Sequence, residues 1–381
     1  MYNLFVVHTD PPQDDKNLNL AIFLPNLDGG GAQKATARLA NALVKKNVRV
    51  TLLASRGGGV VSGMLDARIR IVAFNSSRVL FSVPGVVRFL NQNRPDILLS
   101  IQTNANLSAI ISRLFSYRKT RLIVSERSSY TTRVKGRDGV KARLMVQLVP
   151  LLYRFADLVT SVSAGVADDL QGYIRNREIV PLYNPVVDNG LLAQTKKEVD
   201  EPWLRSHGRP VILAVGRLGP EKDYPTLLKA LKLMREKAHA RLIILGEGRE
   251  RANLEKMIAS LGLEGAVKMP GFAENPYAYM SRADVFVLSS VREGLPNVLI
   301  EAMACRVPVV STDCPYGPRE ILEGGRFGKL VPVGEPRALA DAIMDVLRHT
   351  PDTDIAYRRA LDFSVDHCAD EYLRVFRDLL G

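Results

Sequence analysis

Two successive series of short apolar runs, each interleaved with helix-like patterns, most constrain the fold of this chain of 381 residues. In the first half the strand-like runs are 18–25, 49–55, 97–101, 122–125 and 158–162, and an amphipathic helical pattern covers 32–46. In the second half the runs are 210–216, 241–246, 267–269, 283–288 and 307–311, with helical patterns at 224–237, 250–261 and 337–348. Apolar strands that alternate with helices predict an α/β fold with parallel sheets covered by helices.

A chain of this length exceeds one comfortable hydrophobic core, so two domains are expected. The alternating pattern breaks after residue 188, and the polar stretch 189–209, which contains the only Trp, is predicted to be a linker. We therefore expect an N-terminal domain at 1–188 and a C-terminal domain at 210–363, with a final helix at 364–381 that packs back across the boundary. Open α/β sheets bind ligands at the carboxyl ends of their strands, so two such sheets would line one central cleft.

The composition is that of a soluble globular protein, with 46% hydrophobic and 24% charged residues. No apolar run approaches the roughly 18 residues needed to cross a bilayer, and the N-terminus lacks the basic start of a signal peptide. The three cysteines are odd in number and show no CxxC spacing, which disfavours a disulfide framework. These features predict a protein of the reducing cytoplasm.

The net charge of +12 is unevenly distributed. Residues 1–190 hold 25 Lys/Arg against 13 Asp/Glu, whereas residues 191–381 hold 27 of each. Eleven Lys/Arg fall within 113–154, where the only acids are Glu126 and Asp138, and the same stretch contains an apolar run at 144–153. Such a stretch suits peripheral contact with the anionic inner face of a cell membrane. A nucleic-acid surface and a solvated basic face remain alternatives.

The segment 292–304 contains two acids that flank a helix start. Glu293 lies in a Gly/Pro turn, Glu301 lies in an apolar helical run, and Pro296 with Asn297 suits the first helical turn. Backbone N–H groups at a helix start attract phosphate, and carboxylates accept hydrogen bonds from sugar hydroxyls. The pattern therefore indicates a sugar-nucleotide site, with a solvated loop acid and a surface helix acid as the alternative reading.

Two further loops follow predicted strands. Gly29, Gly30 and Gly31 lie between the first strand and its helix, where glycines let backbone N–H groups approach a phosphate or sugar. The sequence is neither a P-loop nor GxGxxG, and Gly246-Glu247-Gly248 lacks the third glycine of a dinucleotide fingerprint. The loop at 216–224 carries Arg217 and Lys222, which could neutralise a diphosphate leaving group or be ordinary surface cations.

No metal site is predicted. The five histidines share no ligand spacing, and the one Asp-x-Asp, at 352–354, lies in a polar segment beside a proline. We accordingly expect neither a metal nor another cofactor.

Taken in order, these motifs resemble the retaining glycosyltransferases of family 4, which have the GT-B fold. The resemblance covers nearly all of the chain after about residue 18 and is strongest in the Glu-x7-Glu stretch at 293–301, the Gly-Arg…Lys loop at 216–222 and the glycines at 29–31. Weaker parts are Asn184-Pro185, Gly271-Phe272 and Gly317-Pro318-Arg319-Glu320. The resemblance implies two Rossmann-like doubly wound domains that face a central cleft, with the nucleotide sugar bound by the C-terminal domain.

The resemblance also implies roles for individual residues. Arg217 and Lys222, on the loop that begins at Gly216, would hold the donor diphosphate. Glu293 would contact hydroxyls of the transferred sugar, and Glu301 would bind the ribose hydroxyls. The remaining implied donor contacts are the backbone N–H groups of Asn297, Val298 and Leu299, the base neighbours Gly271 and Phe272, and Gly30 and Gly31 of the first domain.

One position departs from the family pattern. Many relatives carry a histidine after the N-domain strand that here ends in Glu126 and Arg127. Arg127 could bind the sugar or an acceptor phosphate, and Glu126 could hold a sugar hydroxyl. A structural role for both residues is an equal alternative.

The expected function is transfer of a hexose or N-acetylhexosamine, with retention, from a nucleotide sugar, expected to be a UDP-sugar, to a lipid-linked or polysaccharide acceptor in cell-surface glycan synthesis. The family reaction uses the leaving phosphate as the base, which agrees with a sequence that offers no evident side-chain base. A nucleotide-sugar epimerase on the same fold is one alternative, although the acid/base set it needs is not evident. A nucleic-acid binder is another, but 113–154 offers neither interleaved aromatics on a sheet nor an evident reading helix, so no nucleic-acid partner is expected.

Overall fold

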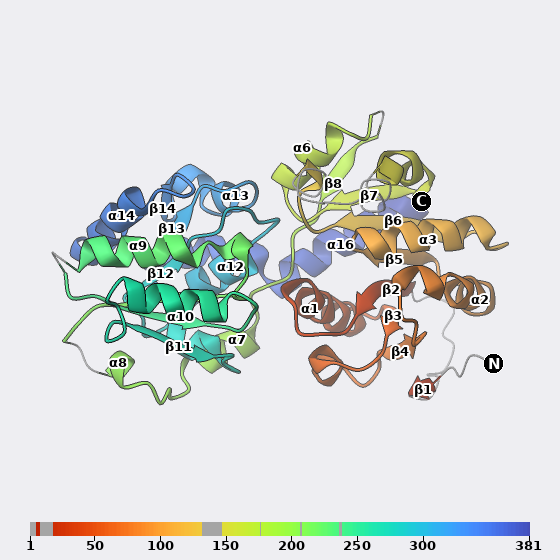
Figure 1. The fold of residues 1–381 in the computed structure, drawn as a ribbon. Helices are drawn as coiled ribbons and strands as arrows, with labels where there is room; N and C mark the ends of the chain where they lie inside the picture. Colours follow the sequence, from red (N-terminus) through yellow and green to blue (C-terminus); the bar gives the residue numbers. More distant parts are fainter. Residues whose placement is uncertain (1–4, 8–17, 132–146, 176, 206–207, 236–237) are drawn as a thin grey trace. The chain divides into compact units, whose positions relative to one another are not determined.

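The computed structural model describes residues 5–7, 18–131, 147–175, 177–205, 208–235 and 238–381 (Figure 1). The chain divides into two compact units. The N-terminal unit comprises Met1–Pro185 and Val365–Gly381, and the C-terminal unit comprises Val186–Ser364.

The N-terminal unit is built on one eight-stranded sheet of order β1-β4-β3-β2-β5-β6-β7-β8. The strands are β1 (Phe5–Val7), β2 (Asn19–Asn26), β3 (Arg49–Arg56), β4 (Arg70–Ala73), β5 (Ile97–Ile101), β6 (Arg121–Glu126), β7 (Leu158–Ser161) and β8 (Ile179–Pro181). Every pairing is parallel except that of β1 with β4. The strand order reverses between β2 and β5, which makes the sheet doubly wound.

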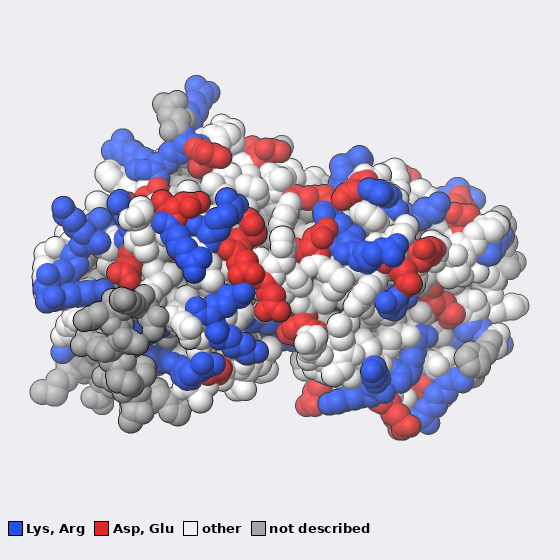
Figure 2. All heavy atoms as spheres, turned by 180° about the vertical axis from the view of Figure 1, so that it is seen from behind, with Lys and Arg blue, Asp and Glu red and all other residues white. Residues whose placement is uncertain are grey.

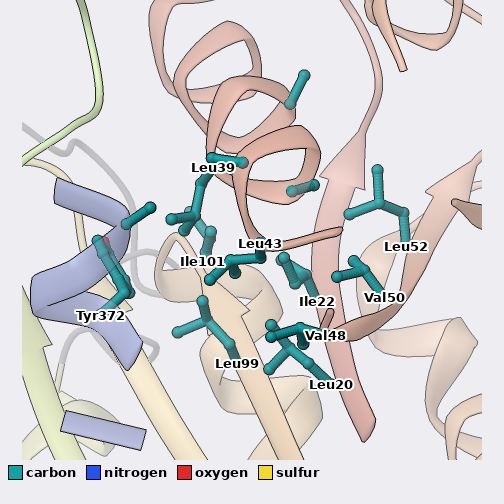
Figure 3. Packing of buried hydrophobic residues seen from close by; sticks show 14 of the residues in the cluster. Leu20, Ile22, Leu39, Leu43, Val48, Val50, Leu52, Leu99, Ile101 and Tyr372 are labelled. Carbon is teal, nitrogen blue, oxygen red and sulfur yellow. The ribbon is translucent and has the colours of Figure 1, made fainter. Parts of the chain in front are cut away.

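Alternate side chains of the central strand β2 enter two different cores. Leu20 and Ile22 pack in one core with α1 (Gly31–Lys45) and α16 (Val365–Leu380). Ala21 and Phe23 pack in the other with α2 (Val83–Asn93), α3 (Thr103–Phe115) and α6 (Ala164–Gln171). Figure 3 shows the first core, where Leu39 and Leu43 of α1 meet the sheet and Tyr372 of α16. Because successive strand side chains point to opposite faces, β2 is apolar at every position of its interior.

The C-terminal unit contains a six-stranded sheet of order β11-β10-β9-β12-β13-β14, in which every pairing is parallel. Its strands are β9 (Val211–Val215), β10 (Arg241–Leu245), β11 (Val267–Gly271), β12 (Val285–Leu288), β13 (Val309–Thr312) and β14 (Lys329–Val331). Its main helices are α9 (Tyr224–Met234), α10 (Arg251–Ser260), α11 (Pro276–Met280), α12 (Asn297–Ala304), α13 (Pro318–Ile321), α14 (Pro336–Arg348) and α15 (Thr353–Ala360). The order reverses between β9 and β12, so this sheet has the Rossmann pattern and its switch point lies between those two strands.

The predicted α/β architecture and the positions of the long elements are confirmed, and the sequence missed the short ones. The strand predicted at 97–101 is β5, and the helix predicted at 337–348 begins one residue earlier, at Pro336. The sequence missed β1, β4, β8 and β14, which have only three or four residues each. Runs of that length are too short to show a periodicity, so only their neighbours in the sheet define them.

The stretch predicted as a linker, 189–209, differs in the structure, where it belongs to the C-terminal unit. Its helix α7 (Asn189–Thr195) packs on α11, and its short helix α8 (Pro202–Arg205) holds the single Trp203. The ammonium of Lys268 lies 4.4 Å from the Trp203 ring centroid and 2.6 Å from a carboxylate oxygen of Glu201. The polar composition that suggested a linker reflects these surface helices. Residues 206–207 lie outside the described residues, as do residues 132–146 of the predicted membrane-contact stretch 113–154.

The C-terminal helix α16 returns to the N-terminal unit. It packs on α1, and Lys46 forms an ion pair of 2.7 Å with Asp370. Within the C-terminal unit, the N–H groups of Val186 and Val187 both donate to the carbonyl oxygen of Phe363, at 2.9 and 3.1 Å. The chain passes between the units at 185–186 and at 364–365. Hydrogen bonds hold the two crossings on the C-terminal side, and the packing of α16 holds the second crossing on the N-terminal side.

We expect Phe376→Ala to destabilise the N-terminal unit although residue 376 is almost at the end of the chain. Phe376 is fully buried against the β2 core, and removing a buried phenyl ring costs about 3–5 kcal/mol in the free energy of unfolding. Urea denaturation followed by circular dichroism measures the change, and hydrogen exchange locates it in β2 and β5. Leu380→Ala, at an exposed leucine of the same helix, serves as the control. Equal stability of the two variants would contradict this account of α16.

Candidate functional site

The switch point of the C-terminal sheet brings together two loops that the sequence singled out. One follows β9 and contains Arg217 and Lys222, and the other follows β12 and contains Glu293. Because β9 and β12 are parallel neighbours, both loops leave the same edge of the sheet. The loops are joined directly, since the Val291 N–H donates to the Glu221 carbonyl at 2.9 Å and the Ser289 hydroxyl donates to the Lys222 carbonyl at 2.7 Å.

Lys222 and Glu293 form an ion pair at the centre of this edge. Lys222 Nζ lies 2.6 Å from Glu293 Oε1, and each side chain is only 15% exposed. The Ser290 hydroxyl donates to the same carboxylate oxygen at 2.7 Å. The backbone of Glu293 is also fixed, because its N–H donates to the Pro315 carbonyl at 2.8 Å. Two residues predicted from separate motifs, 71 positions apart, are therefore in contact.

Arg217 lies on the same loop but is 75% exposed. Its guanidinium donates to Glu221 Oε1, with Nη2 at 2.5 Å. Burial of Glu221 favours a higher pKa, but the hydrogen bonds and charge of Arg217 outweigh it and hold the pKa of this carboxyl below its ordinary value. An ion pair with so exposed a partner contributes at most about 1 kcal/mol, so Arg217 can exchange Glu221 for another anion at little cost.

Two glycines after β10, Gly246 and Gly248, let the loop after β10 pack directly against the loop that carries Arg217. The sequence motif alone did not indicate this packing role. A Cβ on Gly246 would lie 2.0 Å from the Gly216 carbonyl oxygen, and one on Gly248 would lie 2.3 Å from that of Leu218. Two hydrogen bonds hold the loops together: the Gly216 N–H donates to the Leu245 carbonyl and the Leu218 N–H donates to the Glu247 carbonyl, both at 2.9 Å. The detectable signal was a glycine pair directly after a strand, which indicates close backbone approach as readily as a dinucleotide motif.

Tyr224 fixes the start of the same loop. Its buried hydroxyl donates to the Gly216 carbonyl at 3.2 Å. Burial, followed by the charges of Glu293 and Glu221, raises the pKa of this phenol far above its ordinary value. The hydroxyl therefore stays protonated and remains a donor at any physiological pH. No motif distinguished this tyrosine in the sequence, because its role depends on the loop that folds over it.

The helix α12 begins where the second motif predicted, with Pro296 at the N-cap and Asn297 as the first helical residue. Asn297 and Val298 are half-buried in its first turn. The Leu299 N–H, one of the predicted donors to phosphate, donates to the Pro296 carbonyl at 2.9 Å in this structure. Glu301 is half-buried, as its apolar neighbours suggested, and accepts a hydrogen bond of 3.3 Å from the Tyr277 hydroxyl.

The thiols closest to the two acids are not reactive. Burial and then the charge of Glu301 raise the pKa of Cys305 to about 12. Burial and then the charge of Glu293 raise the pKa of Cys314 to about 12. Both thiols are therefore protonated at neutral pH, and neither is poised as a nucleophile.

The end of β11 completes this edge of the sheet. Gly271 has a φ of +95°, and its carbonyl accepts the Gly246 N–H at 2.7 Å. Phe272 follows it and is exposed. The structure therefore brings Gly216, Gly271 and Phe272, at the ends of β9 and β11, to the same edge of the sheet as the ion pair. Their predicted contacts with a nucleotide stay predictions.

The glycine-rich loop of the N-terminal unit lies between β2 and α1, at the switch point of its own sheet. Gly30 is the N-cap of α1, Gly31 is its first residue, and both are exposed. The Gln33 side chain donates to Asn26 Oδ1 at 3.0 Å and braces the turn. The loop thus presents exposed backbone at a helix start, and its approach to a donor stays a prediction.

Glu126 and Arg127 have different surroundings. Glu126 is 1% exposed, and its carboxyl accepts hydrogen bonds from Thr103 (3.0 Å), Asn106 (3.4 Å) and the Tyr153 hydroxyl. Arg127 is half-buried and donates to Asn184 Oδ1 and to the Tyr372 hydroxyl (3.2 Å). Glu126 therefore braces the inside of the N-terminal unit, whereas Arg127 joins the end of β6 to the segment before Pro185 and to α16.

Within the described ranges, no group of three or more His, Cys, Asp or Glu side chains is arranged to hold a metal ion. No helix in the same part of the chain is long and apolar enough to cross a bilayer.

Comparison with known proteins agrees with this architecture. Residues 195–360 match the family model of glycosyl transferases group 1, and residues 29–189 match that of glycosyltransferase family 4. The chain is 28% identical over 347 residues to the N-acetylgalactosamine-N,N'-diacetylbacillosaminyl-diphospho-undecaprenol 4-alpha-N-acetylgalactosaminyltransferase of Campylobacter jejuni, covering 86% of this chain and 90% of the relative.

A second relative is an uncharacterized glycosyltransferase of Methanocaldococcus jannaschii, 30% identical over 283 residues, which are 69% of this chain and 68% of the relative. Among solved structures, HepE of Anabaena in complex with UDP superposes with a TM-score of 0.77 at 22% identity, covering 95% of this chain and all of HepE. The predicted resemblance is thereby confirmed, and the chain belongs to the group 1 glycosyltransferases of the GT-B fold.

Proposed function

We propose that this glycosyltransferase transfers a hexose or N-acetylhexosamine from a UDP-sugar, with retention at the anomeric carbon, to a lipid-linked or polysaccharide acceptor of the cell surface. The observation that carries the proposal is the Lys222–Glu293 pair beside Arg217 at the switch point of the C-terminal sheet. The UDP complex of HepE supports the nucleotide, and the diphospho-undecaprenol in the name of the Campylobacter relative supports the acceptor class.

The donor diphosphate would bind Arg217 and Lys222. Two oriented cations can neutralise the charge that develops on the leaving UDP without a metal ion. Lys222 is pre-positioned by its ion pair, whereas the exposed Arg217 can turn from Glu221 to a phosphate. The negative charge on the leaving UDP grows during the reaction. A fixed Lys222 can bind the diphosphate from the start, and a movable Arg217 can follow the developing charge.

The sugar and ribose would be held by the two acids. Glu293 Oε1 already accepts from Lys222 and Ser290, and within the described residues its Oε2 has no hydrogen-bond partner, so Oε2 can accept a sugar hydroxyl. Glu301, half-buried in α12, would bind the ribose hydroxyls. Neither acid needs to act as a base in this scheme.

Retention follows if donor and acceptor react on the same face of the sugar. The bond from the anomeric carbon to the phosphate oxygen breaks, and the bond to the acceptor oxygen forms on that face. The acceptor proton passes to the departing phosphate oxygen, so the base is part of the substrate. The protein would supply binding, orientation and charge stabilisation.

We further propose that the reaction takes place on the cytoplasmic face of the membrane, with peripheral contact through the basic stretch 113–154. A lipid-linked acceptor is itself held in a bilayer, and clustered Lys/Arg side chains are attracted to anionic headgroups. Two segments of this stretch, 113–131 and 147–154, lie within the described residues.

A thermal-shift panel of nucleotide sugars tests the donor class. UDP and one or more UDP-sugars are expected to raise the melting temperature, because a ligand that binds only the folded protein stabilises it. Incubation of the stabilising UDP-sugar with a lipid-linked acceptor should release UDP, and NMR of the product should show the anomeric configuration of the donor. Stabilisation by ADP- or GDP-sugars alone, an epimerised nucleotide sugar, or an inverted product would contradict the proposal.

Arg217→Ala, Lys222→Ala and Glu293→Gln should each lower kcat/KM for the donor by about 10²–10³-fold, since each removes a group that stabilises the leaving diphosphate or holds the sugar. Steady-state transfer assays measure the loss, and circular dichroism checks the fold. Arg348→Ala is the matched control, because it also removes one exposed cation from the C-terminal unit, in the last turn of α14. Full activity in the three site variants, or an equal loss in the control, would refute the site assignment.

Transfer should persist after the divalent metals are removed with EDTA, because Arg217 and Lys222 are proposed to neutralise the diphosphate. Rates of UDP release with EDTA and with added Mg²⁺ or Mn²⁺ are the measurement, and they should agree within about twofold. Activity that EDTA abolishes and Mn²⁺ restores would show that a metal carries this role.

A further inference from the structure

An exposed group of apolar side chains lies on the N-terminal unit, and three of its five members belong to the stretch 113–154 proposed above for membrane contact. Its members are 53–74% exposed and come from the 3₁₀ turn Val79–Ser82, the end of α3 and the segment just after α3. They are Leu80, Phe81, Leu114, Phe115 and Tyr117. We call this group the apolar ridge. Large apolar side chains gathered on a soluble surface usually mark a binding site.

The two elements that carry the apolar ridge are held together. The 3₁₀ turn packs on α3, and the Ser112 hydroxyl donates to the Val83 carbonyl at 3.5 Å. Asn91 Oδ1 of α2 accepts hydrogen bonds from the Ser116 hydroxyl (2.8 Å) and the Tyr117 N–H (3.3 Å). The apolar ridge therefore rests on a fixed platform of helices and keeps its shape when it meets a partner.

The sequence segment that carries the apolar ridge has an almost entirely positive charge. Residues 67–125 contain nine Lys/Arg and one acid, Asp96, whose carboxylate accepts the Asn19 N–H at 2.8 Å. Arg68 and Arg121 pair with Asp66 and Asp157. Within the described residues Arg78, Arg88 and Lys119 are exposed and make no ion pair, and Arg118 lies 4.8 Å from the Tyr117 ring centroid. Figure 2 shows clusters of Lys and Arg at the outer edge of this unit, on the left of the picture.

We propose that the apolar ridge docks on an anionic lipid bilayer. Phe81, Leu114 and Phe115 would enter the headgroup boundary, Tyr117 would lie at the interface, and the surrounding cations would contact lipid phosphates. The proposal deepens the proposed function, because it names the surface by which the enzyme reaches a membrane-held acceptor. The surface overlaps 113–154 at its first residues and extends it to the 3₁₀ turn Val79–Ser82, which supplies Leu80 and Phe81.

The chemistry favours a bilayer over other partners. A second copy of this chain would bring the same unpaired cations face to face across a two-fold interface, which is repulsive. A nucleic acid would use the cations but gives no reason for exposed leucines. A bilayer surface satisfies both halves of the pattern, since anionic headgroups pair with the cations and the acyl boundary takes up the apolar side chains.

Vesicle co-sedimentation of the full chain tests the proposal. The protein should bind vesicles of phosphatidylcholine and phosphatidylglycerol, and bind more weakly to phosphatidylcholine alone. Phe81→Ser with Phe115→Ser should lower binding about tenfold or more without changing the net charge. Arg78→Gln and Lys119→Gln should each lower binding to the anionic vesicles about fivefold. Leu380→Ser, at an exposed leucine of the same unit, is the control and should bind as the unchanged protein does.

Equal vesicle binding by the Phe81/Phe115 variant and the unchanged protein would overturn the proposal, as would no binding to either vesicle. Self-association or RNA binding that the apolar substitutions abolish, without any vesicle binding, would reassign the surface to that partner. The thermal shift with UDP is measured on every variant. A preserved UDP shift with lost vesicle binding separates the membrane surface from donor binding, and vesicle binding without any UDP shift would refute only the donor assignment.

Discussion

The structure depends on the parallel pairing of β9 with β10 on one side and β12 on the other. A strand with parallel neighbours on both sides needs helical crossovers, so both faces of the sheet are covered, and every side chain of β9 is apolar. The crossovers run in opposite directions from β9, which leaves an uncovered point at the carboxyl ends of β9 and β12. Arg217, Lys222 and Glu293 all lie on the loops at this point, and the glycines after β10 let a third loop close against them.

The same edge shows how the charged side chains of the site are held in place. Each proposed phosphate-binding cation has a carboxylate partner, Lys222 with Glu293 and Arg217 with Glu221. The first pair is largely shielded from water and fixed by Ser290, so it defines the geometry. The second pair is exposed and weak, so it keeps Glu221 ionised and releases Arg217 easily. The two cations on the loop after β9 therefore differ, because Lys222 is held rigidly and Arg217 can change its partner.

The N-terminal unit shows why adjacent residues in the sequence need not share a function. Glu126 and Arg127 stand at the end of β6, where strand alternation points neighbouring side chains in opposite directions. Glu126 enters a buried network with Thr103, Asn106 and Tyr153, and Arg127 contacts Asn184 and Tyr372. This contact explains the weak motif Asn184-Pro185, because Asn184 accepts a hydrogen bond from Arg127 just before the chain leaves the N-terminal unit.

The sequence by itself determined the fold class, the positions of the long strands and helices, and the loops that carry the site. It could do so because a parallel strand is buried on both faces and a helix on one face, so apolar residues recur along the chain with a recognisable pattern. Only the tertiary structure decided that Lys222 contacts Glu293, that Gly246 and Gly248 permit a backbone contact, that 189–209 packs into the C-terminal unit, and that the apolar ridge is exposed. These features depend on groups far apart in the chain, and a local pattern contains no information on which distant residue will lie opposite.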